Sequence, residues 1–112
     1  MSKIKIGDTV TVTVDRPIHS HHPDYPDLVY PINYGYIAGV PAADGEDQDA
    51  YILGVDTPIS SFTGCVKAII HRKNDIEDKL VVAPDDLAVT EDMILGATSF
   101  QEQYFDISLI MS

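Results

Sequence analysis

The feature that most constrains the fold is a series of short apolar segments separated by turn-forming residues. The clearest is Val10 to Val14, where valine and threonine alternate strictly, as expected of a strand with one buried face. Asn, Asp, Gly and Pro cluster between the segments. The expected strands cover residues 10–14, 29–38, 50–55, 65–71, 79–83 and 104–111. Many short strands with very little helix predict a closed β-barrel or a β-sandwich.

One short helix is expected near the C-terminus. The side chain of Thr90 can cap a helix, and Glu91 and Asp92 suit its positive N-terminal end. Gly96 is expected to end this helix. Because 112 residues suffice for one hydrophobic core, we expect residues 1–112 to form a single, mainly β domain of the α+β class.

The charge of the chain narrows the classes of partner. The sequence has 18 acidic and 7 basic residues, a formal net charge of −11. Nucleic acids and anionic membranes require basic surfaces, so we expect neither as a partner. Cys65 has no second cysteine to pair with, and we expect it to be buried. No segment has the pattern of a signal peptide or a membrane helix, which favours a cytoplasmic location.

The segment with the most specific chemistry is Asp44 to Asp49 (Asp-Gly-Glu-Asp-Gln-Asp), with four carboxylates in six residues. Carboxylates this close repel one another unless a hard cation neutralises them. Mg²⁺ is usually bound by a few carboxylates together with substrate phosphates. Before the next strand, Asp44, Glu46 and Asp49 could share one face. The segment predicts a magnesium site and a phosphate-containing substrate, and a solvated acidic loop is the alternative.

A second acidic cluster, residues 74–79, lies between two expected strands. Its carboxylates are Asp75, Glu77 and Asp78. Alone, it is typical of an exposed polar turn. Combined with the first cluster, it could complete a site with several metal ions that clamps both oxygens of a phosphoryl transfer. Lys79 and Arg16 would then be natural phosphate ligands.

Three histidines, His19, His21 and His22, lie in an expected loop that also contains prolines. Histidine-rich tracts can bind zinc, copper or nickel, but this spacing fits no closed structural site. A surface loop that closes over an anion when protonated is the other interpretation. The sequence has no glycine-rich phosphate loop and no dinucleotide fingerprint.

Three motifs, in this order, resemble those of the soluble family I inorganic pyrophosphatases, in a short form. They are Tyr30-Pro31-Ile32-Asn33-Tyr34-Gly35-Tyr36-Ile37, then residues 44–49, then Glu77-Asp78-Lys79-Leu80-Val81. The resemblance covers residues 10–84 and, more weakly, residues 100–104. It implies a five-stranded, OB-like closed β-barrel and the Mg²⁺-dependent hydrolysis of pyrophosphate to two phosphates.

The resemblance also implies roles for individual residues. The Mg²⁺ ligands would be Asp44, Asp49, Asp75 and either Glu77 or Asp78. Glu46 would activate the attacking water, at a position where the family usually has Asp. The phosphate contacts would come from Tyr34, Lys79, Arg16 and Tyr104. Tyr34 and Lys79, together with Glu46, would form the catalytic set.

The sequence departs from the family at several positions. Phe105 stands where a Lys normally follows Tyr104, and the N-terminal hairpin with its Lys and Arg is compressed. Arg16 would replace the missing Arg, and Asp15 would match a metal-side Glu. The smaller set of cations leaves two alternatives open: a hydrolase of another small phosphate anhydride or ester, and a catalytically inactive metal-binding barrel module. A homo-oligomer is also left open, because the C-terminal helix of longer members is absent.

Overall fold

The computed structural model describes residues 4–42, 45–73 and 78–111. Within these ranges it has the following strands and helix in chain order: β1 (Thr9–Arg16), β2 (Asn33–Pro41), β3 (Asp47–Ile52), β4 (Ser61–Arg72), β5 (Asp78–Ala83), α1 (Glu91–Glu102) and β6 (Ile107–Ile110). No helix in this part of the chain is long and apolar enough to cross a membrane.

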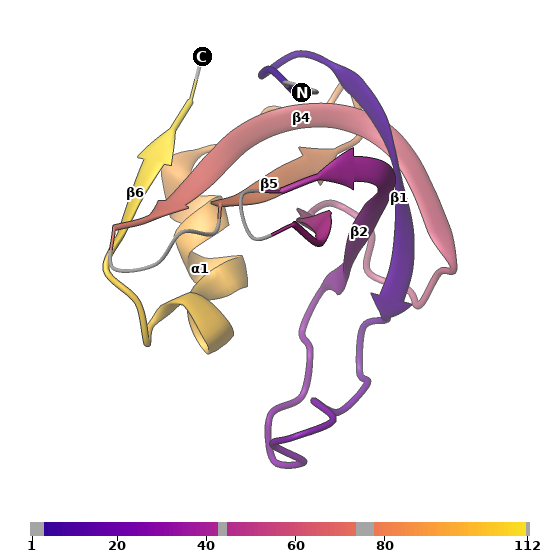
Figure 1. Ribbon diagram of the computed structural model, residues 1–112, viewed down its shortest axis with the longest axis vertical. Helices are drawn as coiled ribbons and strands as arrows, with labels where there is room; N and C mark the ends of the chain where they lie inside the picture. Colours follow the sequence, from indigo (N-terminus) through magenta and orange to yellow (C-terminus); the bar gives the residue numbers. More distant parts are fainter. Residues whose placement is uncertain (1–3, 43–44, 74–77, 112) are drawn as a thin grey trace.

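Five strands close into a barrel, as the sequence predicts. They are hydrogen-bonded in the order β1-β2-β3-β5-β4, and β1 also pairs with β4. The β3–β5 pair is parallel and the other neighbours are antiparallel. The long strand β4 curves across the top of the barrel in Figure 1, and α1 and β6 lie beside its far end. The expected OB-like barrel with one helix near the C-terminus is therefore confirmed.

The side chains of the strands alternate between two hydrophobic clusters. Residues of all five barrel strands, such as Val12, Ile52 and Val66, form the barrel interior. Tyr51, the neighbour of Ile52 in β3, packs with Ile94 of α1 in the second cluster, as does Ile70, which follows a register shift in β4. The helix is thus fixed against the outside of the barrel.

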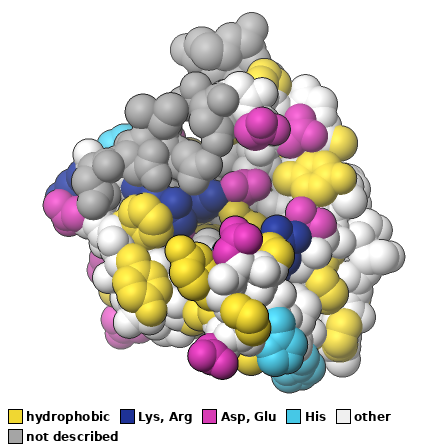
Figure 2. Space-filling view, turned by 60° about the horizontal axis from the view of Figure 1, so that its bottom comes forward, with side chains coloured by type: hydrophobic (Ala, Val, Ile, Leu, Met, Phe, Trp, Pro, Cys, Tyr) yellow, Lys and Arg dark blue, Asp and Glu magenta, His cyan; other side chains and the backbone are white. Residues whose placement is uncertain are grey.

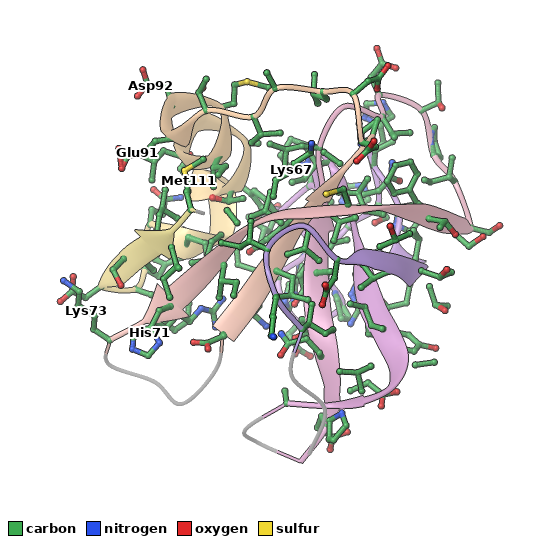
Figure 3. The ribbon with its side chains drawn as sticks, turned by 90° about the horizontal axis from the view of Figure 1, so that it is seen from above. Lys67, His71, Lys73, Glu91, Asp92 and Met111 are labelled. Atoms are coloured by element: carbon green, nitrogen blue, oxygen red, sulfur yellow. The ribbon has the colours of Figure 1, made fainter. Side chains whose placement is uncertain are left out.

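The helix is longer than expected, and the prediction that Gly96 ends it is wrong. Thr90 is the N-cap, and its Oγ1 accepts a hydrogen bond from Met93 N at 3.2 Å. Glu91 and Asp92 begin the helix and point away from the barrel in Figure 3. A glycine within a helix costs only about 1 kcal/mol relative to alanine. The buried residues of the helix, Ile94, Thr98 and Glu102, recur every four positions, so the helix continues until Glu102 completes this buried face.

Several strand boundaries also differ from the expected ones, as three examples show. The segment 47–49, expected as loop, belongs to β3, where Asp49 pairs with Tyr36. The strand expected from residue 29 begins at Asn33, because Pro31 has no N–H to offer a ladder and Tyr30 O accepts instead from His19 N. The last strand begins at Ile107, after a turn that follows α1.

Two small residues have the environments that their positions require. Cys65 is buried, as expected. Gly35 lies where β2 passes closest to β1, and a Cβ there would lie only 1.9 Å from the carbonyl oxygen of Thr13. Only glycine allows this approach of the two backbones.

Candidate functional site

A cleft of about 970 Å³ opens on the face of the barrel beside the segment between β1 and β2. Five of the predicted catalytic, substrate-binding and metal-binding residues line it: Arg16, Tyr34, Asp49, Lys79 and Tyr104. They come from β1, β2, β3, β5 and the segment after α1, so closure of the barrel brings them together. On the face shown in Figure 2, Lys and Arg side chains lie among hydrophobic side chains, with histidines at the lower margin.

Lys79 lies at the buried inner end of this cleft. Its Nζ donates to Asp49 Oδ2 at 2.5 Å and to the Tyr34 hydroxyl at 2.9 Å. Burial, followed by the neighbouring Asp49 carboxylate, raises the pKa of Tyr34 far above its ordinary value. The phenol therefore stays protonated, and it can donate to an acceptor while it accepts from Lys79.

Arg16, at the end of β1, offers an unpaired donor. Its Nε is buried and has no hydrogen-bond partner among the residues described, while Nη1 lies 3.7 Å from Asp15 Oδ2. A buried donor without an acceptor costs about 1–3 kcal/mol. Arg16 also opposes the rise that burial causes in the pKa of Tyr30. An anion in the cleft would supply the missing acceptor.

The described carboxylates of the first acidic segment lie around an adjoining hollow of about 260 Å³. Glu46, Asp47 and Asp49 line it with Tyr36, so Asp49 lies on the boundary between the hollow and the cleft. Their oxygen donors are of the kind that Mg²⁺ prefers. Within residues 4–42, 45–73 and 78–111, however, no three His, Cys, Asp or Glu side chains are arranged to hold a metal ion.

The other expected metal ligands belong to neither cavity or cannot be placed. Asp44, Asp75 and Glu77 lie outside the described residues. Asp78 begins β5, and its Oδ1 lies 2.7 Å from Nδ1 of His71. Figure 3 shows His71 near the end of β4, close to the edge where β6 joins the sheet.

The histidine-containing segment forms one side of the cleft. His22 lines the cleft and its ring stacks on Tyr30, with 6.2 Å between centroids and 6° between the planes. His21 lies outside the lining, and its Nδ1 is 2.7 Å from the carbonyl oxygen of Pro26. His19 is exposed with a positive φ of 74°. Only His22 thus contributes to the candidate site.

Sequence reasoning missed a buried ion pair on the opposite wall. Arg72 binds Glu102 through two hydrogen bonds, of 2.9 Å from Nε and 2.6 Å from Nη2. Its guanidinium carbon lies 3.7 Å from the centre of the Phe105 ring. A cation therefore covers the residue that replaces the expected Lys. No local pattern signals this pair, because Arg72 ends β4 and Glu102 ends α1.

The same network fixes a tyrosine behind the cleft. The Tyr51 hydroxyl donates to Glu102 Oε2 at 2.6 Å and accepts from Gln101 Nε2 at 2.7 Å. Burial and the Glu102 carboxylate raise the pKa of Tyr51 well above its ordinary value. The wall between α1 and the barrel is therefore held by charge-assisted hydrogen bonds.

No protein-family model and no curated protein matches the sequence. Several solved structures, by contrast, match the chain. The inorganic pyrophosphatase of Ehrlichia chaffeensis superposes with a TM-score of 0.70 at 14% identity, over 98% of this chain and 92% of that one. The chain has the fold of the inorganic pyrophosphatases.

Two further inorganic pyrophosphatases show the same relation. That of Helicobacter pylori gives a TM-score of 0.63 at 17% identity, over 98% of this chain and 88% of that one. That of Thermus thermophilus gives 0.60 at 18% identity, over 96% and 85%. Identities this low concern the pyrophosphatase fold alone, and the chemistry rests on the residues of the cleft.

Proposed function

We propose that the protein hydrolyses the phosphoanhydride bond of pyrophosphate to release two phosphates, with Mg²⁺ as cofactor. The observation that carries this proposal is the meeting of Lys79, Tyr34 and Asp49 with the unpaired donor of Arg16 in one cleft. The shared fold with inorganic pyrophosphatases supports it. The cytoplasmic location stays a prediction from the sequence, and a homo-oligomer stays open.

In this proposal the cations hold the phosphates. Arg16 donates through Nε, and Lys79 neutralises the oxygens nearest to the inner end of the cleft. The protonated Tyr34 hydroxyl donates to a phosphate oxygen once the substrate competes with Asp49 for it. Tyr104 closes the site from the rim. All four interactions strengthen as negative charge develops on the leaving phosphate.

The donor chemistry of the adjoining hollow fits Mg²⁺. Asp49 would bind it, with Asp44, Asp75 and either Glu77 or Asp78 as further ligands. When bound, Mg²⁺ neutralises phosphate charge and lowers the pKa of a water. Glu46, which lines the same hollow as Asp49, accepts the proton of the attacking water. In the structure, the Lys79 ammonium is the counter-ion of the Asp49 carboxylate.

One observation favours a different function, a metal-binding barrel without turnover. Phe105 lines the cleft where a Lys normally follows Tyr104 in the family that the sequence resembles, and the Arg72 guanidinium over its ring is already paired with Glu102. A module of this kind would bind Mg²⁺ or phosphate without releasing phosphate from pyrophosphate. The two functions therefore differ in one measurable quantity, the rate of phosphate release.

The test is phosphate release from pyrophosphate by the Asp49→Asn variant at saturating Mg²⁺. The substitution keeps the size of the side chain but removes its charge, and the rate should fall by about 100-fold or more. Asp86→Asn is the matched control, because Asp86 is exposed and lines neither cavity. Equal rates for the wild type and a folded Asp49→Asn variant would overturn the assignment of the site.

A further inference from the structure

The cleft is much larger than two phosphate groups require. Its volume of about 970 Å³ lies at the upper end of the range of about 300–1,000 Å³ for pockets that enclose drug-sized ligands. Lys79 and Arg16 reach only part of it. Most of the remaining wall is formed by the segment 17–32, by the residues after α1 and by Arg72, whose charge is paired with Glu102. A substrate that fills the cleft would carry a further group on its phosphates.

A row of aromatic rings leads from the phosphate-binding end towards the rim. The ring centroids of Tyr34 and Tyr30 lie 5.7 Å apart, those of Tyr30 and His22 6.2 Å apart, and those of His22 and Tyr25 5.2 Å apart. The row begins at the Lys79 ammonium, bonded to the Tyr34 hydroxyl. It ends at Tyr25, which lines the cleft but is 67% exposed. The outermost ring therefore has an open face.

Tyr104 gives the rim a second exposed ring. It is 72% exposed, and no large hydrophobic side chain in the described ranges is more exposed. Exposed aromatic side chains on a concave surface are typical of a binding site for an apolar or planar group. Tyr25 and Tyr104 both line the cleft, from the loop before β2 and the turn after α1.

The charged residues that line the cleft also differ between its inner end and its rim. The segment 17–32 contains no Lys or Arg, and its Asp24 and Asp27 line the cleft near Tyr25. These carboxylates repel phosphate but accept hydrogen bonds from hydroxyl and amino groups. The inner end therefore suits phosphate, and the rim suits an uncharged ring that carries hydrogen-bond donors.

We propose that the cleft binds a nucleoside diphosphate, with its phosphates at Arg16 and Lys79 and its base against Tyr25 and His22. This inference rests on the proposed function, because it uses the same phosphate-binding end. The water oxygen forms a bond to the terminal phosphorus, and the bond from that phosphorus to the bridging oxygen breaks. The products are a nucleoside monophosphate and inorganic phosphate, and the proton of the water passes through Glu46 to solvent.

The experiment compares two ligands that differ only in the nucleoside. Both have a carbon between their phosphorus atoms and cannot be hydrolysed there: the α,β-methylene analogue of ADP, and methylenediphosphonate. Calorimetric titration of the wild type with each, in Mg²⁺ buffer, gives two dissociation constants. Stacking of one base on an aromatic side chain predicts about 5- to 150-fold tighter binding of the ADP analogue.

Three variants locate the contribution of the base. Tyr25→Ala should remove most of the preference for the ADP analogue and leave the affinity for methylenediphosphonate unchanged. Tyr25→Phe should retain the preference, because it keeps the ring. Leu95→Ala is the control for loss of an exposed apolar side chain, since Leu95 is 41% exposed on α1 and outside the cleft.

Each outcome separates this inference from the proposed function. Equal affinities of the wild type for the two analogues, or a preference that survives in Tyr25→Ala, would overturn the nucleoside site and leave pyrophosphate hydrolysis standing. A preference that depends on Tyr25, without phosphate release from any substrate, would support the binding site and overturn hydrolysis. Failure of both analogues to bind would overturn the nucleoside site, and phosphate release from pyrophosphate would still decide the proposed function separately.

Discussion

At the scale of single residues, the two arginines of the cleft have opposite energetic roles. Arg72 is paired with Glu102 through side chains that are only 5% and 1% exposed, so each compensates the buried charge of the other. Arg16 is half-buried, lies 3.7 Å from an exposed Asp15, and keeps one buried donor without an acceptor in the described part of the chain. Arg72 therefore stabilises the fold, whereas Arg16 is placed for a ligand.

The Arg72→Met substitution should destabilise the protein strongly. It leaves the Glu102 carboxylate buried without its counter-ion, which costs about 3–5 kcal/mol in the free energy of unfolding. Urea-induced unfolding, followed by circular dichroism, measures this change. Arg16→Met is the comparison and should not lower stability, because it removes a buried donor that has no acceptor, while it lowers phosphate release from pyrophosphate. Similar losses of stability in the two variants would contradict this division of roles.

At the scale of elements, two glycines that look alike in the sequence have different structural roles. Gly35 is required where β2 crosses close to β1, because a Cβ would meet the carbonyl oxygen of Thr13 at 1.9 Å. Gly96 lies within α1, and nothing would lie within 4 Å of a Cβ built on it. The close approach of two backbones therefore requires glycine at position 35, whereas the surroundings of position 96 leave room for a side chain.

Substitution of each glycine by alanine should therefore have opposite effects. Gly35→Ala forces β1 and β2 apart and should lower the free energy of unfolding by about 3 kcal/mol or more. Gly96→Ala should raise it by about 1 kcal/mol, because alanine has the higher helix propensity. Thermal unfolding of both variants checks the two signs. A Gly96→Ala variant less stable than the wild type would show that the helix needs its glycine.

The elements also show how far a sequence predicts this structure. The alternation of valine and threonine is sufficient to predict β1, and the capping side chain of Thr90 predicts the start of α1. The end of α1 was missed because the burial of Glu102 depends on Arg72, a contact between two elements that no local pattern contains. Closure of the barrel was expected from the family resemblance. The size of the cleft was not expected, because it depends on how the segment 17–32 stands against α1.

At the scale of the whole molecule, stability should fall at alkaline pH. The pKa values of Tyr30, Tyr34 and Tyr51 are all raised from 10.0, mainly by burial. Above pH 10 the unfolded chain loses these phenol protons while the folded chain keeps them, so unfolding releases protons and the free energy of unfolding declines. Below pH 10 both states keep the protons, and these tyrosines cause no pH dependence.

The expected slope is about 1.4 kcal/mol per pH unit for each tyrosine that stays protonated only in the folded state. Urea unfolding at a series of pH values from 9 to 11.5 measures it. Tyr51→Phe removes one phenol and should make the alkaline slope shallower by that amount. The same slope in the variant and the wild type would show that Tyr51 ionises equally in both states.

As a whole, we propose, the molecule is a phosphoanhydride hydrolase. The most direct test is the rate of phosphate release from pyrophosphate by the wild-type protein, measured with Mg²⁺ and again with the metal chelated. We expect release far above the rate in buffer alone, which is lost when Mg²⁺ is removed and restored when it is returned. Release no faster than in buffer, from folded protein with Mg²⁺ present, would contradict it.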